Sequence, residues 1–254
     1  MKGKASKSKE LSGRVIMVTG AGRGIGAAVA KSLASHGATV ILVGRRVAGL
    51  EAVYDAIKAA GGPEPAIAPL NLELMNSQEC DSLINNIGKE FGKLDGLLHN
   101  ATHLAGLTPL SHYSPQEWYK TLQINLNSPF LLTLACLPLL AAAPDASILF
   151  TGDAVGRHGK AYYGAYGVSK FAAEGLMQTL AEETQANTSI RVNSLDPGTV
   201  RTDLFKRIYP GRLDDVIPSP EDIVHPYLFL LGPASRGITG QSFRAQENGP
   251  WSKA

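Results

Sequence analysis

A tyrosine and a lysine four positions apart are the first residues that could carry chemistry. Tyr166 and Lys170 occur in the sequence YGVSK. In a helix, residues with this spacing share one face. An ammonium beside a phenol lowers the phenol pKa from about 10, and the phenol can then exchange a proton with a substrate oxygen near neutral pH. Tyr54 and Lys58 have the same spacing without any other feature of a site, so position in the fold decides the meaning of such a pair.

A glycine-rich segment near the N-terminus is the second feature. TGAGRGIG, residues 19–26, lies between a β-branched run and an amphipathic stretch. Glycines let the backbone turn tightly and approach a pyrophosphate, and the following helix N-terminus offers free N–H groups and a positive dipole end. The spacing differs from G-x-G-x-x-G, and glycine turns also occur for packing alone. Its position after the first expected strand favours dinucleotide binding.

The end of the next β-branched run indicates which dinucleotide is bound. A carboxylate there would bind the ribose hydroxyls of NAD, but the sequence has Gly44, Arg45 and Arg46 and no acid. Guanidinium groups match a 2′-phosphate, and Arg23 in the glycine turn could add to this. The alternative is two solvated arginines at a helix start. NADP(H) is therefore the predicted cofactor, with NAD(H) as the alternative.

These residues need a scaffold, and the hydrophobic pattern supplies one. Short β-branched runs alternate with amphipathic stretches, which predicts parallel strands with helices on both faces. Right-handed crossovers then give a doubly wound, Rossmann-type α/β sheet, whose ligands bind at the carboxyl ends of the strands. The expected seven strands cover residues 14–19, 39–43, 66–70, 95–99, 147–151, 190–195 and 241–243. The expected helices cover residues 25–35, 47–60, 78–91, 115–142, 163–184 and 220–231.

Composition sets the limits of the protein class. A chain of 254 residues with 44% hydrophobic content fits one domain, expected over residues 11–246 with a C-terminal tail at 247–254. The lysine-rich residues 1–10 are predicted to be a disordered basic leader; an arm for nucleic acid or membrane is the alternative. Neither a signal core nor a membrane-length apolar run is evident, and the two cysteines suggest neither a disulfide nor a metal site. We expect a cytoplasmic protein without nucleic-acid or membrane partners.

Over residues 11–246 the chain resembles the short-chain dehydrogenase/reductase family. The matching pieces are the glycine turn in its T-G-x-x-x-G-x-G form, HNA at 99–101, INLN at 124–127, the Tyr–Lys pair, and DPG at 196–198 before Arg201 and Thr202. The stretch from Phe150 to Glu183 is most similar to YciK-like oxidoreductases. The resemblance implies hydride transfer between a nicotinamide cofactor and a small alcohol or carbonyl substrate.

The resemblance also implies a role for individual residues. Tyr166 would be the general acid/base, Lys170 would hold the nicotinamide ribose and lower the Tyr166 pKa, and Asn125 would anchor a proton-relay water. The long apolar helices would form a homodimer or homotetramer. The implied cofactor-binding residues are Gly20, Gly22, Arg23, Gly24, Ile25, Gly26, Arg45, Arg46, Asn71, Leu72, Asn100, Ala101, Lys170, Pro197, Gly198, Val200 and Thr202.

One catalytic residue of the family is changed. Its serine lies thirteen positions before the tyrosine, where this chain has Asp153. Loss of such a hydrogen-bond donor costs about 2.7–4 kcal/mol, and a carboxylate at ~4 Å would repel a developing alkoxide by up to about 4 kcal/mol at an effective dielectric of ~20. A protonated Asp153 could act as the donor, or the carboxylate could pair with a cationic or amine part of a substrate. The alternative function is a dinucleotide-binding sensor or scaffold with impaired or no turnover.

Smaller departures concern the surroundings of the site. Asn71 stands where the family often has an Asp that contacts adenine, and Thr102 replaces a glycine that follows Asn100 and Ala101. The segment 203–218 is expected to form a lid that sets specificity. Tyr162, Tyr163 and His158 are candidates for the pocket wall, with simple packing or surface exposure as the alternative.

Overall fold

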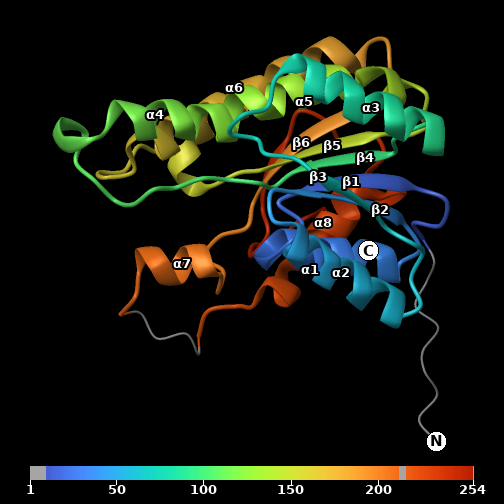
Figure 1. The fold of residues 1–254 in the computed structure, drawn as a ribbon, viewed down its shortest axis with the longest axis horizontal. Coiled ribbons are helices and arrows are strands. Elements are labelled where there is room, and N and C mark those ends of the chain that lie inside the picture. The colour runs from blue at the N-terminus through green and yellow to red at the C-terminus, as the bar shows by residue number, and fades with distance from the viewer. Residues whose placement is uncertain (1–9, 212–215, 254) are drawn as a thin grey trace, which may run out of the picture.

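The protein is a three-layer α/β structure with one parallel sheet between two layers of helices (Figure 1). The computed structural model describes residues 10–211 and 216–253. The basic leader predicted for residues 1–10 lies, except for residue 10, outside the described residues. The seven strands are β1 Val15–Thr19, β2 Thr39–Gly44, β3 Ala66–Pro69, β4 Gly96–His99, β5 Ser147–Thr151, β6 Arg191–Asp196 and β7 Ser242–Arg244.

The strand order confirms the predicted doubly wound sheet. It is β3-β2-β1-β4-β5-β6-β7, and every neighbouring pair is parallel. The chain runs outward in one direction from β1 and in the other from β4, so the order reverses between these two strands. In open parallel sheets, ligands bind in the crevice at the carboxyl ends of the strands at such a reversal.

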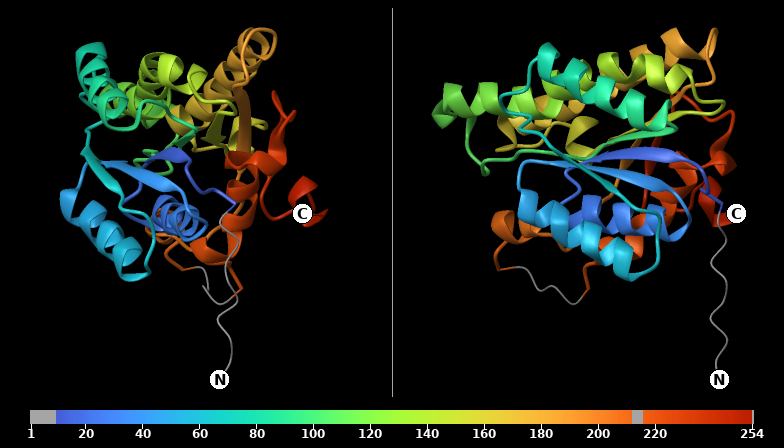
Figure 2. Two further views of the ribbon diagram at one scale, coloured as in Figure 1. Left: turned by 90° about the vertical axis from the view of Figure 1, so that its right-hand side faces the viewer. Right: turned by 45° about the vertical axis from the view of Figure 1, so that its right-hand side comes forward.

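Helices cover both faces of the sheet, as Figures 1 and 2 show. Helices α1 Gly24–Ser35, α2 Val47–Ala59 and α8 Val224–Leu231 cover one face, and α3 Ser77–Phe91, α5 Ser128–Ala141 and α6 Gly164–Gln185 cover the other. Along β1, Ile16 and Val18 belong to the core on the α1 side, and Val15 and Met17 to the core on the α5 side. Burial on both faces explains why the strand is a continuous apolar run.

The helix predicted over residues 115–142 is not continuous, so that prediction was wrong in detail. Helix α4 Pro115–Leu122 is followed by a π turn at Gln123–Asn127, and α5 begins at Ser128. Pro129 lacks the N–H that would bond to the Asn125 carbonyl in a regular α-helix, which weakens regular helix geometry here. The periodicity of the apolar residues gave no sign of this interruption.

The expectation that the chain has no apolar run of membrane length was wrong: the run Pro115–Ala141 is long and apolar enough, by length and composition, to cross a membrane, with a mean hydropathy of 1.6 in its most apolar window. It is, within the described residues, the single helical run that meets this criterion. Its residues Leu132, Cys136 and Leu140 are fully buried in the core against the sheet. The α5 part of the run therefore packs in the core, where an apolar composition is expected.

The residues after 246 contact the core. Trp251, in the short turn Pro250–Lys253, is buried and packs edge-on against Phe229 and Phe243 at ring-centroid distances of 6.3 and 5.6 Å. This end of the chain thus covers the side of the molecule formed by α8 and β7.

Candidate active site

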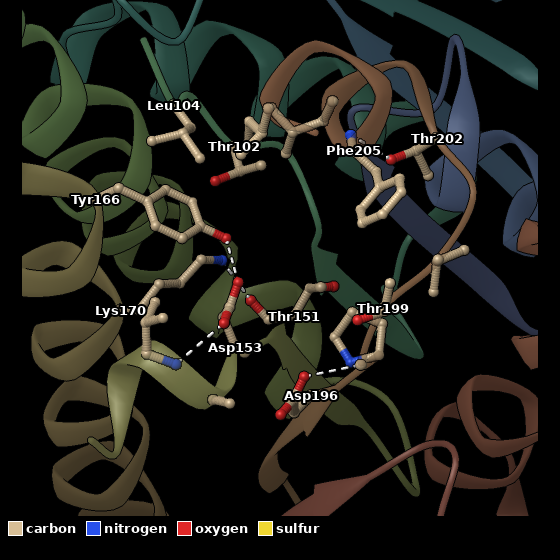
Figure 3. A pocket seen from close by; sticks show the side chains of 18 of the residues that line it. Thr102, Leu104, Thr151, Asp153, Tyr166, Lys170, Asp196, Thr199, Thr202 and Phe205 are labelled. Atoms are coloured by element: carbon tan, nitrogen blue, oxygen red, sulfur yellow. Dashed lines mark hydrogen bonds between the residues drawn. The ribbon is translucent and has the colours of Figure 1, made fainter. Parts of the chain in front are cut away.

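A cavity of about 430 Å³ lies at the carboxyl ends of the strands, next to the glycine turn (Figure 3). Its walls come from β4, β5, β6 and the start of α6, and α7 Asp203–Ile208 forms a further wall. The segment predicted as a loop-like lid therefore begins with a short helix, which contributes Leu204, Phe205 and Ile208 to the cavity. Residues 212–215 of that segment lie outside the described residues.

The glycine turn approaches β4 so closely that side chains are excluded from it. Gly20 and Gly24 have φ values of +69° and +54°, which favour glycine. A Cβ on Gly26 would lie 2.3 Å from the carbonyl oxygen of Gly20 and 2.6 Å from Nδ2 of Asn100. The result is a bare backbone surface at the N-terminus of α1, which is the shape and polarity that a pyrophosphate requires.

Hydrogen bonds fix this turn to the end of β4. The Thr19 hydroxyl accepts the N–H groups of Asn100 and Ala101 at 3.0 and 3.1 Å. Nδ2 of Asn100 donates to the carbonyl oxygen of Thr19 at 3.1 Å. Ile25 lines the cavity, and a Cβ on Gly22 would contact Gly49 of α2 at 3.2 Å. The structure thus brings the predicted residues of the turn and of β4 into one unit.

A second turn closes the opposite side of the cavity. Pro197 and Gly198 follow β6, and the Gly198 N–H donates to Oδ1 of Asp196 at 2.8 Å. Nε2 of Gln246 donates to the carbonyl oxygens of Pro197 and Thr199 at 2.9 and 2.8 Å. Sequence reasoning missed Gln246, because no motif connects it to a turn almost fifty residues earlier. Val200 is buried in the wall, and the Thr202 hydroxyl caps α7 by accepting from Phe205 N.

The predicted phosphate-binding arginines lie on the surface beside the glycine turn. Arg45 contacts Glu73 at 3.7 Å with 61% of its side chain exposed, so that ion pair is weak and easily exchanged. Arg46 is exposed at the N-cap of α2, and Arg23 pairs with Asp203 of α7 at 3.5 Å. These groups are free to meet a phosphate, and together with the bare turn they fit a nicotinamide dinucleotide.

The two predicted residues after β3 have structural partners. Oδ1 of Asn71 accepts from the backbone N–H of Glu73 at 3.2 Å, and the carbonyl of Leu72 accepts from the Ser128 hydroxyl. Asn71 is half-buried near the same edge of the sheet as Arg45. Their contact with a cofactor remains a prediction.

Tyr166 and Lys170 lie together at the start of α6, as their spacing predicts. They are 5% and 7% exposed, and Nζ of Lys170 is 5.5 Å from the centroid of the Tyr166 ring. Lys170 donates to the backbone carbonyl of Thr151 at 2.7 Å. Both side chains line the cavity, which leaves the Tyr166 hydroxyl at its wall.

Asp153 engages the tyrosine directly. Its Oδ2 accepts a hydrogen bond from the Tyr166 hydroxyl at 2.7 Å, and its Oδ1 accepts from the backbone N–H of Val155 at 3.0 Å (Figure 3). The second bond caps the short turn Ala154–Gly156 and fixes the direction of the carboxylate. The position of the family serine is therefore occupied by a group that takes the tyrosine proton into a hydrogen bond rather than offering one to a substrate.

These surroundings change the expected acidity of the tyrosine. Burial, and then the charge and hydrogen bond of Asp153, raise the pKa of Tyr166 well above its ordinary value. Burial lowers the pKa of Lys170, against the opposing effect of the Asp153 charge. Burial and the carboxylate thus act in the direction opposite to the one implied for the ammonium, and the role of Lys170 in lowering the Tyr166 pKa remains a prediction. Tyr166 is held as a neutral proton donor.

Asn125 is not among the residues that line the cavity; it connects the segment after β4 to α6. Its Oδ1 accepts from the backbone N–H of His103 at 2.7 Å, and its Nδ2 donates to the His103 carbonyl at 2.9 Å and to the Ser169 hydroxyl at 3.0 Å. Both amide hydrogens are thus used to hold the segment after β4 against α6. The water-anchoring role implied for Asn125 remains a prediction. His103, whose Nε2 lies 2.9 Å from Glu117, was missed because its contribution comes from the backbone.

The remaining wall is largely aromatic and apolar. Tyr163 and His158 line the cavity as proposed, but Tyr162 does not: it is 56% exposed and has a φ of +74°. Tyr163 and Tyr209 share a hydrogen bond between their hydroxyls at 2.6 Å. Thr102 lines the cavity, and its buried hydroxyl has no hydrogen-bond partner among the residues that the structure describes.

Comparison with known proteins gives the family. The sequence profile of the short chain dehydrogenase family matches residues 14–212. The chain is a short-chain dehydrogenase. This dehydrogenase is 42% identical to the oxidoreductase YciK of Escherichia coli K12, over 94% of each chain. It is 30% identical to a 3alpha-hydroxysteroid dehydrogenase of Mediterraneibacter gnavus, over 91% of this chain and 94% of that one.

Solved structures agree with the family assignment. A short chain dehydrogenase from Pseudomonas syringae is 49% identical with a TM-score of 0.91, covering 97% of this dehydrogenase and 100% of that chain. A short chain dehydrogenase from Shigella flexneri, solved in complex with NADP, is 42% identical with a TM-score of 0.92. The match covers 95% of this dehydrogenase and 100% of that chain. The predicted similarity to YciK-like oxidoreductases is therefore confirmed.

The close approach at Gly26 generates the first prediction. Gly26→Ala places a methyl group against the Gly20 carbonyl, so the turn must shift, and we expect the Kd for NADPH to rise at least about tenfold, which corresponds to about 1.4 kcal/mol. NADPH fluorescence titration measures this. Gly175→Ala is the matched control, since it adds the same methyl group where nothing lies within 4 Å. Equal affinities for the two variants would contradict this account of the turn.

The hydrogen bond between Asp153 and Tyr166 generates the second prediction. In the general-base role predicted for Tyr166, alcohol oxidation would need its phenolate, and the Asp153 carboxylate raises the Tyr166 pKa. Asp153→Ser removes that charge and lowers the Tyr166 pKa, so the alkaline rise of the oxidation rate should move to lower pH than in wild type. The measurement is the pH profile of kcat with one secondary alcohol, with Asp55→Asn on the exposed face of α2 as the control. An unmoved profile would show that Asp153 does not govern the tyrosine.

Proposed function

We propose that this dehydrogenase uses NADP(H) to transfer hydride between the nicotinamide and an alcohol/carbonyl pair, with Tyr166 as the general acid/base. The observation that carries the proposal is the burial of Tyr166 and Lys170 side by side in the wall of the cavity beside the glycine turn. A packing role alone would not require an ammonium to be buried next to a phenol, because burying a charge is costly.

The chain's own residues would act as follows. The bound dinucleotide supplies hydride chemistry. Tyr166, kept neutral by burial and by Asp153, donates its proton to the substrate oxygen as negative charge develops there. Lys170, held by the Thr151 carbonyl, lies where it can bind the nicotinamide ribose and supply positive charge. The Pro197–Gly198 turn and α7 exclude water from the reacting groups.

The choice of NADP(H) over NAD(H) rests on the arginines. No acidic residue follows β2, and Arg45 and Arg46 are exposed where a 2′-phosphate would lie at the end of that strand. The Shigella flexneri relative was solved with NADP, and a 41% identical short chain dehydrogenase from Escherichia coli CFT073 was solved with NADPH. Both facts support the same cofactor here.

A second candidate function is a dinucleotide-binding sensor or scaffold with little carbonyl turnover. The hydrogen bond from the Tyr166 hydroxyl to Asp153 favours it, because that bond engages the proton a carbonyl would need.

We also propose a cytoplasmic homodimer or homotetramer that acts on a small molecule. Phe130, Leu134, Val168 and Phe171 support assembly, since these large apolar side chains of α5 and α6 are more than two-fifths exposed.

Removing the two arginines tests the cofactor. For Arg45→Ala/Arg46→Ala we expect a rise of about 10- to 100-fold in the Kd for NADPH, as charge-assisted contacts to the 2′-phosphate are lost, with the Kd for NADH unchanged. Fluorescence titration with both cofactors gives the ratio. Lys89→Ala, an exposed cation on α3 across the sheet, should change neither value. A parallel loss of NADPH and NADH affinity would argue against 2′-phosphate recognition.

A carbonyl panel tests the reaction. NADPH oxidation by wild type, Tyr166→Phe and Asp153→Ser is followed with aldehydes, ketones and keto acids. We expect measurable wild-type turnover, a loss of about 10²-fold or more in Tyr166→Phe, and a gain of about 10- to 100-fold in Asp153→Ser as a hydrogen-bond donor returns. An inert wild type beside an active serine variant would favour the sensor or scaffold. Absence of NADPH binding would contradict both functions.

A further inference from the structure

The Asp153 carboxylate in the cavity wall interacts electrostatically with the Lys170 ammonium but is hydrogen-bonded only to neutral groups. Its two oxygens accept hydrogen bonds from neutral donors, the Val155 N–H and the Tyr166 hydroxyl. It forms no ion pair with any residue in the described part of the chain. A carboxylate that is bonded only to neutral donors attracts cations, and each of its oxygens retains lone pairs that can accept a hydrogen bond from a further donor.

The other charges around the cavity leave this attraction in place. Asp196 is a second carboxylate, bonded to the Gly198 N–H. The Lys170 ammonium already donates to the Thr151 carbonyl and would bind the cofactor ribose. Lys160 lies 5.3 Å from the centroid of the Tyr163 ring, with its residue exposed to solvent, and His158 is also exposed. The wall around Tyr166 therefore carries the buried Asp196 and half-buried Asp153 carboxylates and the buried Lys170 ammonium.

This balance disfavours one kind of hydride acceptor and favours another. A ketone develops negative charge on oxygen as hydride arrives, beside a carboxylate that repels it. A protonated C=N group starts with positive charge on nitrogen and loses it as hydride arrives. Its N–H can donate to the carboxylate oxygen that now accepts from Tyr166, in a charge-assisted hydrogen bond.

We propose that this dehydrogenase also reduces cationic C=N substrates, and prefers them to carbonyls, because Asp153 binds the iminium nitrogen. The inference rests on the proposed function in that NADPH is the hydride source. Hydride adds to the iminium carbon, the π pair of the C=N bond becomes the nitrogen lone pair, and NADPH becomes NADP⁺. No proton is needed in that step, so Tyr166 positions the carboxylate and the product amine takes a proton afterwards.

The shape of the cavity indicates the class of compound. Tyr209 and Phe205 contribute aromatic side chains to the wall, and aromatic rings can interact favourably with a cation. Leu104 and Ile208 give apolar surface for a hydrocarbon ring, and about 430 Å³ is within the size range of small-molecule sites. A cyclic or aryl-substituted imine therefore matches the walls better than a polar open-chain compound.

Matched substrates test the preference. Wild type is assayed near neutral pH with NADPH and dihydroisoquinoline, which has the C=N group, and with α-tetralone, a ketone with the same bicyclic skeleton. We expect kcat/KM for the imine to exceed that for the ketone by at least about tenfold. Asp153→Ser should reverse the order, and Asp153→Asn should lower kcat/KM for the imine by at least about tenfold, because the charge is lost and the size is kept. Asp55→Asn, which removes a distant carboxylate, should leave both values unchanged.

Binding gives a readout that does not depend on turnover. Calorimetry measures the Kd of tetrahydroisoquinoline, an ammonium near neutral pH, and of the alcohol tetralol in the dead-end complex with NADPH. Asp153→Asn should weaken the amine about tenfold and leave the alcohol unchanged. Equal effects on both ligands, or no effect on the amine, would overturn the proposal, as would a wild-type preference for the ketone. If NADPH binds and the ketone alone is reduced, only this inference fails; if NADPH does not bind, the proposed function fails as well.

Discussion

The site depends on one topological constraint, the parallel alignment of all seven strands. Parallel strands place every carboxyl end at one edge of the sheet, and the reversal of strand order between β1 and β4 opens that edge to a ligand. Residues as distant in sequence as Thr19, Asn100, Asp153 and Asp196 become neighbours for this reason alone. The glycine turn adds a second constraint, since a single Cβ at Gly26 would separate it from β4.

Within this shared framework, the electrostatics around Tyr166 give the protein its individual character. A buried phenol, a buried ammonium and a carboxylate form one unit, in which each group changes the proton affinity of the others. The scaffold that binds the dinucleotide is built from backbone atoms and glycines, whereas the part that meets the substrate is built from charges. Cofactor binding and substrate choice are therefore separable properties of this molecule.

Much of the fold could be predicted from the sequence because strand burial and helix amphipathicity leave periodic patterns. The strands were found in this way, whereas the glycine turn and the Tyr166–Lys170 pair were found from their residue types and spacing. Features that depend on contacts between distant segments could not be found. Gln246 reaches the Pro197–Gly198 turn through folding alone, and the hydrogen bond from Tyr166 to Asp153 depends on how the end of β5 lies against the start of α6.

The π turn at Gln123–Asn127 has a consequence for how α4 and α5 are related. A turn of this type holds one residue more than a regular helical turn. Removing that extra residue would restore a regular turn and leave the faces of α4 and α5 as they are, whereas a second deletion would rotate every later side chain of α5 by about 100° around the helix axis. That rotation would take Leu132, Cys136 and Leu140 away from the sheet and turn the outward-facing Phe130 and Leu134. The turn therefore sets the phase between Asn125, which is bonded to the segment after β4, and the surface that this layer presents to solvent.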